Sequence, residues 1–181
     1  MKNLLLKIYG IILILFSSTT YVFGQESYPI PNKTPTRLFY IQHSNNHNTF
    51  VYDAQLKNDS IDIENPIKEY RIVYTEGGVI RPLTRLQKHM AYGLSTNYIS
   101  NNLFEMYLAA NKTRPFFLTL DSNSKPIVYI TINNQKLILD RIFVKLKNNF
   151  SVIHVEADYI LFEGKDFHSL KEVSEKYYLD K

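Results

Sequence analysis

Short apolar runs recur along the chain from Arg37 onward, separated by clusters of Asn, Asp, Ser, Lys and Pro. Within several runs apolar and polar side chains alternate, which is typical of a strand with one buried face. Turn-forming pairs such as Asn101-Asn102 and Asn133-Asn134 lie between the runs. We therefore predict a mainly β fold, an antiparallel β-barrel or β-sandwich of about 8–10 strands with one short helix. The predicted strands are residues 37–43, 48–56, 67–75, 104–110, 115–121, 127–132, 136–146 and 152–162.

The segment PLTRLQKHMAYG has helical periodicity instead of alternation. Leu86 and Met90 would lie on one face of a helix. Thr84 and Gln87 fit a capping box, in which each side chain binds the backbone N–H of the other residue. We predict one short helix at about residues 85–91. Because so short a helix is unstable alone, Leu86 and Met90 are expected to pack on the sheet.

The C-terminal tail carries two conflicting signals. Ser169 and Glu172 fit a capping box. Val173, Glu175 and Tyr177 alternate as in a strand. The structure of the tail therefore stays open.

The N-terminus has the pattern of a secretory signal peptide. Lys2 and Lys7 precede an apolar run at residues 8–16, and a small polar stretch leads from this run to Gly24. We predict cleavage after Gly24, which makes residues 1–24 the signal peptide. The apolar run is shorter than the roughly 20 residues that span a bilayer, and a retained membrane anchor is the alternative. The remaining chain is expected to form an extended, Pro-rich leader at residues 25–36 and a single β domain at residues 37–181.

Composition narrows the possible functions. The chain has no cysteine, so it has no disulfide, no cysteine nucleophile and no cysteine to carry a lipid. It contains neither a glycine-rich phosphate loop nor a GxSxG motif. The net charge of +4 falls to 4 − 2 = +2 when Lys2 and Lys7 leave with the signal peptide, so no nucleic-acid partner is expected. We predict an exported protein, periplasmic or extracellular and not a lipoprotein, with no cofactor and no membrane span after cleavage.

The stretch HSNNHNTFVYDAQL, which starts at His43, predicts a polar hairpin tip. A two-residue turn at residues 45–46 would place Ile41 beside Phe50 and Phe39 beside Tyr52 on one apolar face. A shift of one residue would scatter these side chains over both faces of the ribbon. The register of the hairpin is therefore a specific prediction.

The polar residues do not suggest a metal or catalytic site. The predicted register places His43 and His47 on opposite faces of the hairpin, with Asp53 at its far end. His154 and Glu156 could share a strand face and hold one ion. Two ligands do not complete a zinc site, which takes three or four protein ligands. We therefore predict no metal site, with His154 and Glu156 as the remaining candidates.

Several phrases in order resemble a family of exported bacterial proteins that carries the label domain of unknown function 4833. The phrases are LFYIQHSNNHNTFVYDA, ENPIKEY, PLTRLQKHMAYGL and RIFVKL, and the resemblance covers roughly residues 37 to 165. The family has no established activity, so the resemblance implies no catalytic residue. The positions that match its pattern are Asn48, Thr49, Tyr52, Asn65, Pro66, Tyr70, Ala91, Tyr92 and Gly93.

A β-barrel of this size can be filled by side chains or can hold one small ligand. The leading hypothesis is a non-enzymatic exported binding module for a small apolar or amphipathic ligand, or for an envelope protein. The candidate binding residues are Tyr40, Tyr52, Tyr70 and Tyr92. One alternative is a small envelope hydrolase, metal-assisted or not, that uses His43, His47, His154, Glu156 or Asp53. Another is a structural protein that adds a partner's strand to an exposed sheet edge.

Overall fold

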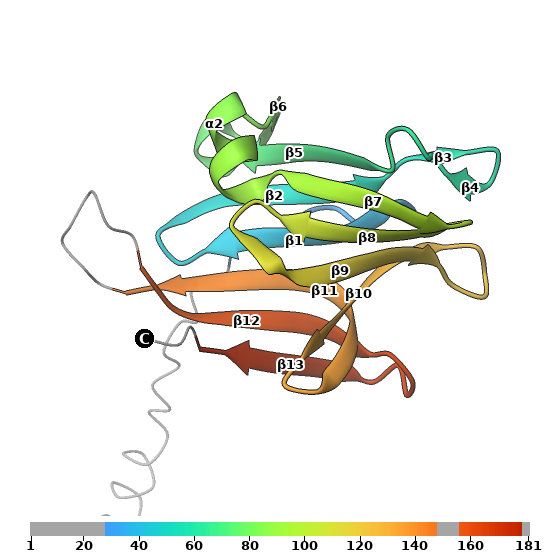
Figure 1. Cartoon of the computed structure of the whole chain (residues 1–181). Coiled ribbons are helices and arrows are strands. Elements are labelled where there is room, and N and C mark those ends of the chain that lie inside the picture. Colours follow the sequence, from blue (N-terminus) through green and yellow to red (C-terminus); the bar gives the residue numbers. More distant parts are fainter. Residues whose placement is uncertain (1–27, 148–155, 179–181) are drawn as a thin grey trace, which may run out of the picture.

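The computed structural model describes residues 28–147 and 156–178, most of which form one curled 11-stranded β-sheet (Figure 1). A separate two-stranded sheet consists of β3 (Leu56–Lys57) and β4 (Ser60–Ile61). The helical elements are η1 (Tyr74–Glu76), α2 (Arg85–Gln87) and the π-helical turn η2 (Lys88–Tyr92). The strands of the large sheet are β1 (Arg37–His43), β2 (Asn46–Ala54), β5 (Ile67–Val73), β6 (Val79–Pro82), β7 (Leu94–Ser100), β8 (Leu103–Leu108), β9 (Asn111–Leu120), β10 (Pro126–Ile132), β11 (Gln135–Leu146), β12 (Ala157–Asp166) and β13 (Glu172–Tyr177).

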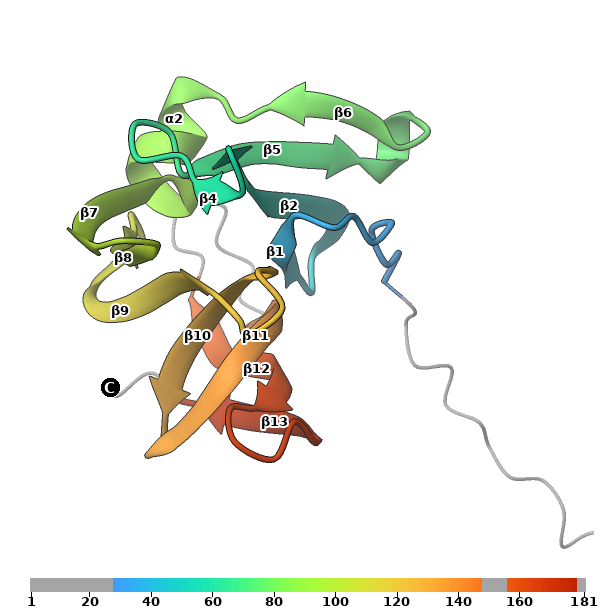
Figure 2. The same ribbon diagram turned by 90° about the vertical axis from the view of Figure 1, so that its right-hand side faces the viewer.

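The large sheet has the strand order β6-β5-β2-β1-β11-β10-β9-β8-β7, and β12 followed by β13 branches from β11. Figure 2 shows that the sheet curls round into a half-barrel. The mainly β fold with one short helix is confirmed, and each predicted strand overlaps an observed one. The sheet is mixed rather than purely antiparallel, because β1 and β11 run parallel with Tyr40 opposite Arg141. The two strands lie far apart in the sequence. Turn residues indicate only hairpins between neighbouring strands, so they could not predict this parallel pair.

Strand β11 changes its partner along one edge. Its first part pairs with β10, with Ile138 opposite Tyr129, and from Arg141 onward it pairs with β1. A bulge between Leu139 and Arg141 interrupts the pairing with β12. Gly164 pairs with Leu139 at this point, and a Cβ on Gly164 would lie 1.9 Å from the carbonyl oxygen of Ile138. Only glycine permits so close an approach of the two strands.

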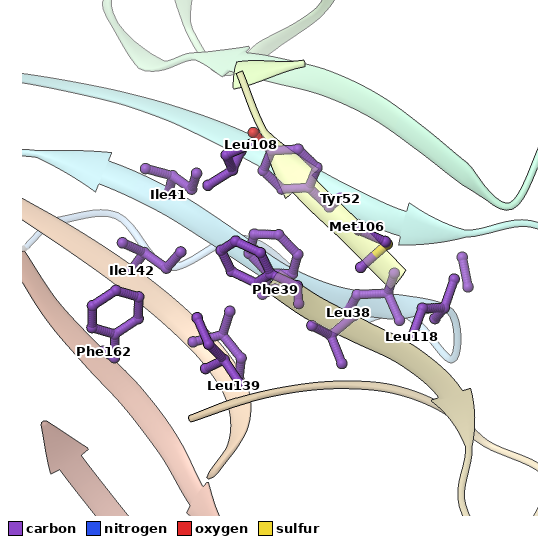
Figure 3. Packing of buried hydrophobic residues seen from close by; sticks show 14 of the residues in the cluster. Leu38, Phe39, Ile41, Tyr52, Met106, Leu108, Leu118, Leu139, Ile142 and Phe162 are labelled. Carbon is purple, nitrogen blue, oxygen red and sulfur yellow. The ribbon is translucent and has the colours of Figure 1, made fainter. Parts of the chain in front are cut away.

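The hydrophobic core lies inside the curl of the sheet (Figure 3). The ring of Phe39 stacks on Tyr52 with centroids 4.4 Å apart and on Phe116 at 5.8 Å. Side chains from β8 and β9, such as Met106 and Leu118, close the core from the other side and are fully buried. Burying one such large apolar side chain stabilises a fold by about 1.5–3 kcal/mol. The core thus holds the domain together without disulfides.

The β1–β2 hairpin has the predicted register in its centre. Ile41 lies opposite Phe50, and the preceding pair is also as predicted. At the tip, His43 pairs with Asn46, so the turn residues are 44–45 instead of the predicted 45–46. A register shift after Ile41 accounts for the difference. The apolar face is unaffected by it, because the shift affects only the polar tip.

The helical segment differs from its prediction in what it buries. The predicted capping box is present. Leu86 and Met90 are 71% and 68% exposed, so the prediction that they pack on the sheet is wrong. Leu83 just before the helix and Tyr92 at its end contact the core instead. The wider π-helical turn carries Tyr92 toward the barrel.

The N-terminal leader contains neither helix nor strand from Tyr28 to Thr36 and packs on the outer face of the sheet. The hydroxyl of Tyr28 donates a hydrogen bond to the backbone oxygen of Ser44, and the Gln42 amide donates one to the oxygen of Pro29 at 2.7 Å. These bonds tie the last part of the leader to β1. The predicted signal peptide lies outside the described residues.

Candidate functional site

An apolar cavity of about 560 Å³ lies at one end of the half-barrel. The tip of the β1–β2 hairpin, the β8–β9 turn and the end of β11 meet there. Its volume is within the range of about 300–1,000 Å³ typical of small-molecule sites. Most of its wall consists of aliphatic and aromatic side chains: Ile41, Leu108, Phe116, Ile142, Val144, Leu146, Ile160 and Phe162.

The cavity lies where backbone pairing between strands stops. β9 pairs with β10 only from Phe117 to Leu120, and β11 pairs with β1 from Arg141 onward. In the described part of the chain, no strand pairing joins the first half of β9 to the second half of β11. Arg114 on β9 lies with its guanidinium carbon 4.1 Å from the ring centroid of Tyr177 on β13.

Three aromatic rings pack together at one wall of the cavity. Tyr92, at the end of η2, stacks on Phe50 of β2 with ring centroids 3.5 Å apart and planes 9° apart. Its hydroxyl lies 2.9 Å from Nε2 of His43, the last residue of β1. Tyr52 donates a hydrogen bond from its own hydroxyl to the backbone oxygen of Tyr92 at 2.7 Å. The position of Tyr92 is therefore fixed at both its backbone and its side chain.

Burial keeps the His43–Tyr92 pair uncharged. It lowers the pKa of His43 from 6.5 to about 4 and raises the pKa of Tyr92 to about 12. At neutral pH both side chains are neutral, because desolvation penalises a charged form. The pair therefore adds two polar groups to the cavity wall without adding a charge.

The four candidate tyrosines do not converge on one site. Tyr92 lines the cavity, and Tyr52 supports it from the core, where it is 0% exposed. Tyr40 faces a groove on the outer side of the sheet beside Arg141, beneath the leader. The structure brings together Tyr52 and Tyr92 and leaves Tyr40 on the opposite face.

Tyr70 lies in a polar network away from the cavity. Its hydroxyl donates to Oδ2 of Asp53 at 2.9 Å and accepts a hydrogen bond from Arg37 at 3.0 Å. Arg37 also forms an ion pair with Asp53 at 2.5 Å. The network joins the strands β1, β2 and β5, and every polar group in it has a partner.

The polar candidates of the alternative functions are dispersed. His47 packs against Tyr28 with ring centroids 5.3 Å apart, on the outer face, whereas His43 lines the cavity. Glu156 forms an ion pair with Lys147 at 2.8 Å. His154 lies outside the described residues. Within residues 28–147 and 156–178, no three His, Asp or Glu side chains are placed to hold a metal ion.

The sequence analysis did not identify Arg114, the positively charged residue in the cavity wall. Arg114 is two residues from Phe116 and four from Leu118, both of which are buried. An arginine in phase with buried positions of a strand is the signal that could have found it. The polar residues beside it in the wall are Asn45, Asn46 and Asn111.

Comparison with known proteins gives one match. The family model described as Domain of unknown function (DUF4833) matches residues 39–176. No curated protein and no solved structure matches significantly. No helix of the described residues is long and apolar enough to cross a membrane. Since the match spans most of the sequence and nearly the whole curled sheet, the chain belongs to the DUF4833 family.

Proposed function

We propose that this domain binds a small apolar or amphipathic molecule inside the half-barrel. The observation that carries the proposal is the cavity of about 560 Å³ between β9 and β11. The wall of this space is mainly apolar, and an apolar ligand would remove that surface from water. Concave, mostly apolar sites with a few polar groups are the usual form of a small-molecule site.

The chemistry of the wall favours binding over catalysis. A general base works best when its pKa is near the working pH, and the pKa of His43 is about 4. The pKa of Tyr92, at about 12, makes its hydroxyl a weak nucleophile at neutral pH. Both groups are better suited to hydrogen-bond a neutral part of a ligand.

The test fills the cavity and measures binding. Val144→Phe adds bulk to the wall, whereas Val79→Phe makes the same change on β6, where Val79 is 46% exposed and away from the cavity. Titration of both variants with the environment-sensitive dye N-phenyl-1-naphthylamine should give loss of binding for Val144→Phe and wild-type binding for Val79→Phe. Equal binding by the two variants, with both folded by circular dichroism, would contradict the proposal.

We also propose that the chain is exported and that its ligand is met in the periplasm or outside the cell. The proposal rests on the signal-peptide pattern of residues 1–24. Mass spectrometry of the protein from cell fractions tests it. A mature N-terminus at Gln25 in the exported fraction is the expected result, and full-length protein confined to the cytoplasm would refute it.

A further inference from the structure

The cavity wall contains one charged side chain among the described residues, and that side chain is Arg114. Arg114 forms no ion pair with any described carboxylate. This is unusual beside an apolar cavity, because a partly desolvated charge is costly unless a group of opposite charge compensates it. Among the described residues, this guanidinium contacts the ring face of Tyr177, and no carboxylate pairs with it.

The guanidinium of Arg114 lies over an aromatic ring. Its central carbon lies 4.1 Å from the ring centroid of Tyr177 on β13, a cation–π contact that restrains the group. A planar guanidinium presents parallel N–H donors that match the two oxygens of a carboxylate. A contact with a ring face occupies no hydrogen-bond acceptor, so the N–H donors of the guanidinium stay available to a ligand.

The neighbouring amides also offer donors. Oδ1 of Asn111 accepts hydrogen bonds from Thr113, and Oδ1 of Asn45 accepts one from Asn46. Both oxygens are thus occupied, and the amide N–H groups of the exposed Asn45 and the half-buried Asn111 are open to solvent or to a ligand. The polar end of the cavity is therefore rich in donors and contains one positive charge.

We propose that the ligand is an anionic amphiphile, with its aliphatic chain among the apolar side chains and its carboxylate bound by Arg114. This inference rests on the proposed function and adds the class of ligand to it. Phe116, Ile142 and Phe162 all line the cavity, and their apolar side chains suit a hydrocarbon chain. A carboxylate at Arg114 would supply a counter-charge that no described residue provides, in a wall that also contains the amides of Asn111 and Asn45.

The experiment compares two ligands that differ only in the headgroup, dodecanoate below its micelle concentration and dodecan-1-ol below its solubility limit. Displacement of N-phenyl-1-naphthylamine from the full mature chain gives both affinities. In the wild-type protein dodecanoate should bind more tightly. Arg114→Gln should weaken dodecanoate by about tenfold to a hundredfold, the range for a charge-assisted hydrogen bond, and leave dodecan-1-ol within about twofold.

Two further variants keep the test specific. Lys112→Gln removes a positive charge from the same strand at a residue that does not line the cavity, and it should leave both affinities unchanged. Arg114→Lys retains the charge without the planar fork and should recover part of the dodecanoate affinity. Melting temperatures of all variants show whether each is folded.

The outcomes separate this inference from the proposed function. If dodecan-1-ol binds but the ratio of the two affinities is the same in wild type and Arg114→Gln, the cavity binds ligands and the anionic class is wrong. If the dye binds but neither amphiphile displaces it from the folded wild-type protein, the ligand class is wrong and the proposed function stands. If the dye does not bind the folded wild-type protein, the proposed function is refuted as well.

Discussion

The burial of His43 predicts a specific loss of stability in mild acid. Folding lowers the pKa of this imidazole from 6.5 to about 4, because the charged form is desolvated beside the cavity. As pH falls below 6.5 the unfolded chain binds a proton at this position before the folded protein does. The stabilisation is therefore fully present above about pH 6.5 and is lost as pH falls toward 4.

The magnitude follows from the two pKa values. At pH 7.5 His43 is neutral in both states and has almost no linked effect on stability. At pH 5 the linked loss in the free energy of unfolding is about 2 kcal/mol, and at pH 4 it reaches about 3 kcal/mol. His43→Gln removes the titration and keeps a group that can hydrogen-bond the Tyr92 hydroxyl. The stability gap between wild type and His43→Gln should shift by about 2 kcal/mol in favour of the variant between pH 7.5 and pH 5.

Urea denaturation followed by circular dichroism at the two pH values measures this shift. All other titratable groups are present in both proteins, so the difference isolates His43. Tyr92→Phe serves as a control, because it retains the burial that lowers the pKa of His43 and should keep the wild-type pH dependence. Parallel stability profiles for wild type and His43→Gln would show that His43 is not desolvated in the folded protein.

Two other substitutions test the sheet. Gly164→Ala places a Cβ against the Ile138 carbonyl at 1.9 Å and should lower the free energy of unfolding by about 2 kcal/mol or more in urea denaturation; wild-type stability would refute the close approach. Tyr70→Phe removes the hydroxyl that donates to Asp53 and should cost about 1–2 kcal/mol. Tyr98→Phe, at a residue 51% exposed, should cost less than about 0.5 kcal/mol, and equal losses for the two tyrosines would show that the network contributes nothing.

The strands that were predicted most accurately from the sequence are those that bury one face and expose the other. The central register of the β1–β2 hairpin is correct because only one pairing puts Ile41 and Phe50 on the same apolar face. Strands β6 and β7 were not predicted. Every residue of β6 is exposed, as are all residues of β7 after Leu94. Such strands have no alternation of buried and exposed positions for periodicity to detect.

Bulges are a second feature that the sequence pattern does not reveal. Strict alternation would put Ala157 and Tyr159 on one face of β12. In the structure Leu146 pairs with Ala157 but Lys145 pairs with Tyr159, so one extra residue lies between the two pairs. Ala157 consequently lines the cavity, whereas Tyr159 faces the outer groove. A bulge reverses the faces of a strand without any change in its composition.

The candidate site was harder to predict than the fold because a tyrosine is compatible with a core, a polar network or a cavity. Tyr52 lies in the core, Tyr70 in a polar network and Tyr92 in the cavity wall. Their environments depend on tertiary contacts between segments that are distant in the sequence, such as the contact of Tyr92 with His43. The hypothesis of an internal ligand site could be formed from the sequence, but the residues that line the site could not be chosen from it.

The cavity is a consequence of how β11 is shared. β12 occupies one edge of β11 along most of its length, so β10 and β1 must divide the other edge. β10 therefore leaves β11 where β1 joins it, and within the described residues the first half of β9 pairs with no strand on that side. Backbone hydrogen bonds cannot span such an interval, and side chains must form the wall.

A filled barrel would place an apolar residue at the position of Arg114, whereas here a cation lies over the ring of Tyr177 with no described carboxylate beside it. The branch in the sheet thus creates the space, and the positive charge of Arg114 in its wall determines which charge a ligand in that space should carry.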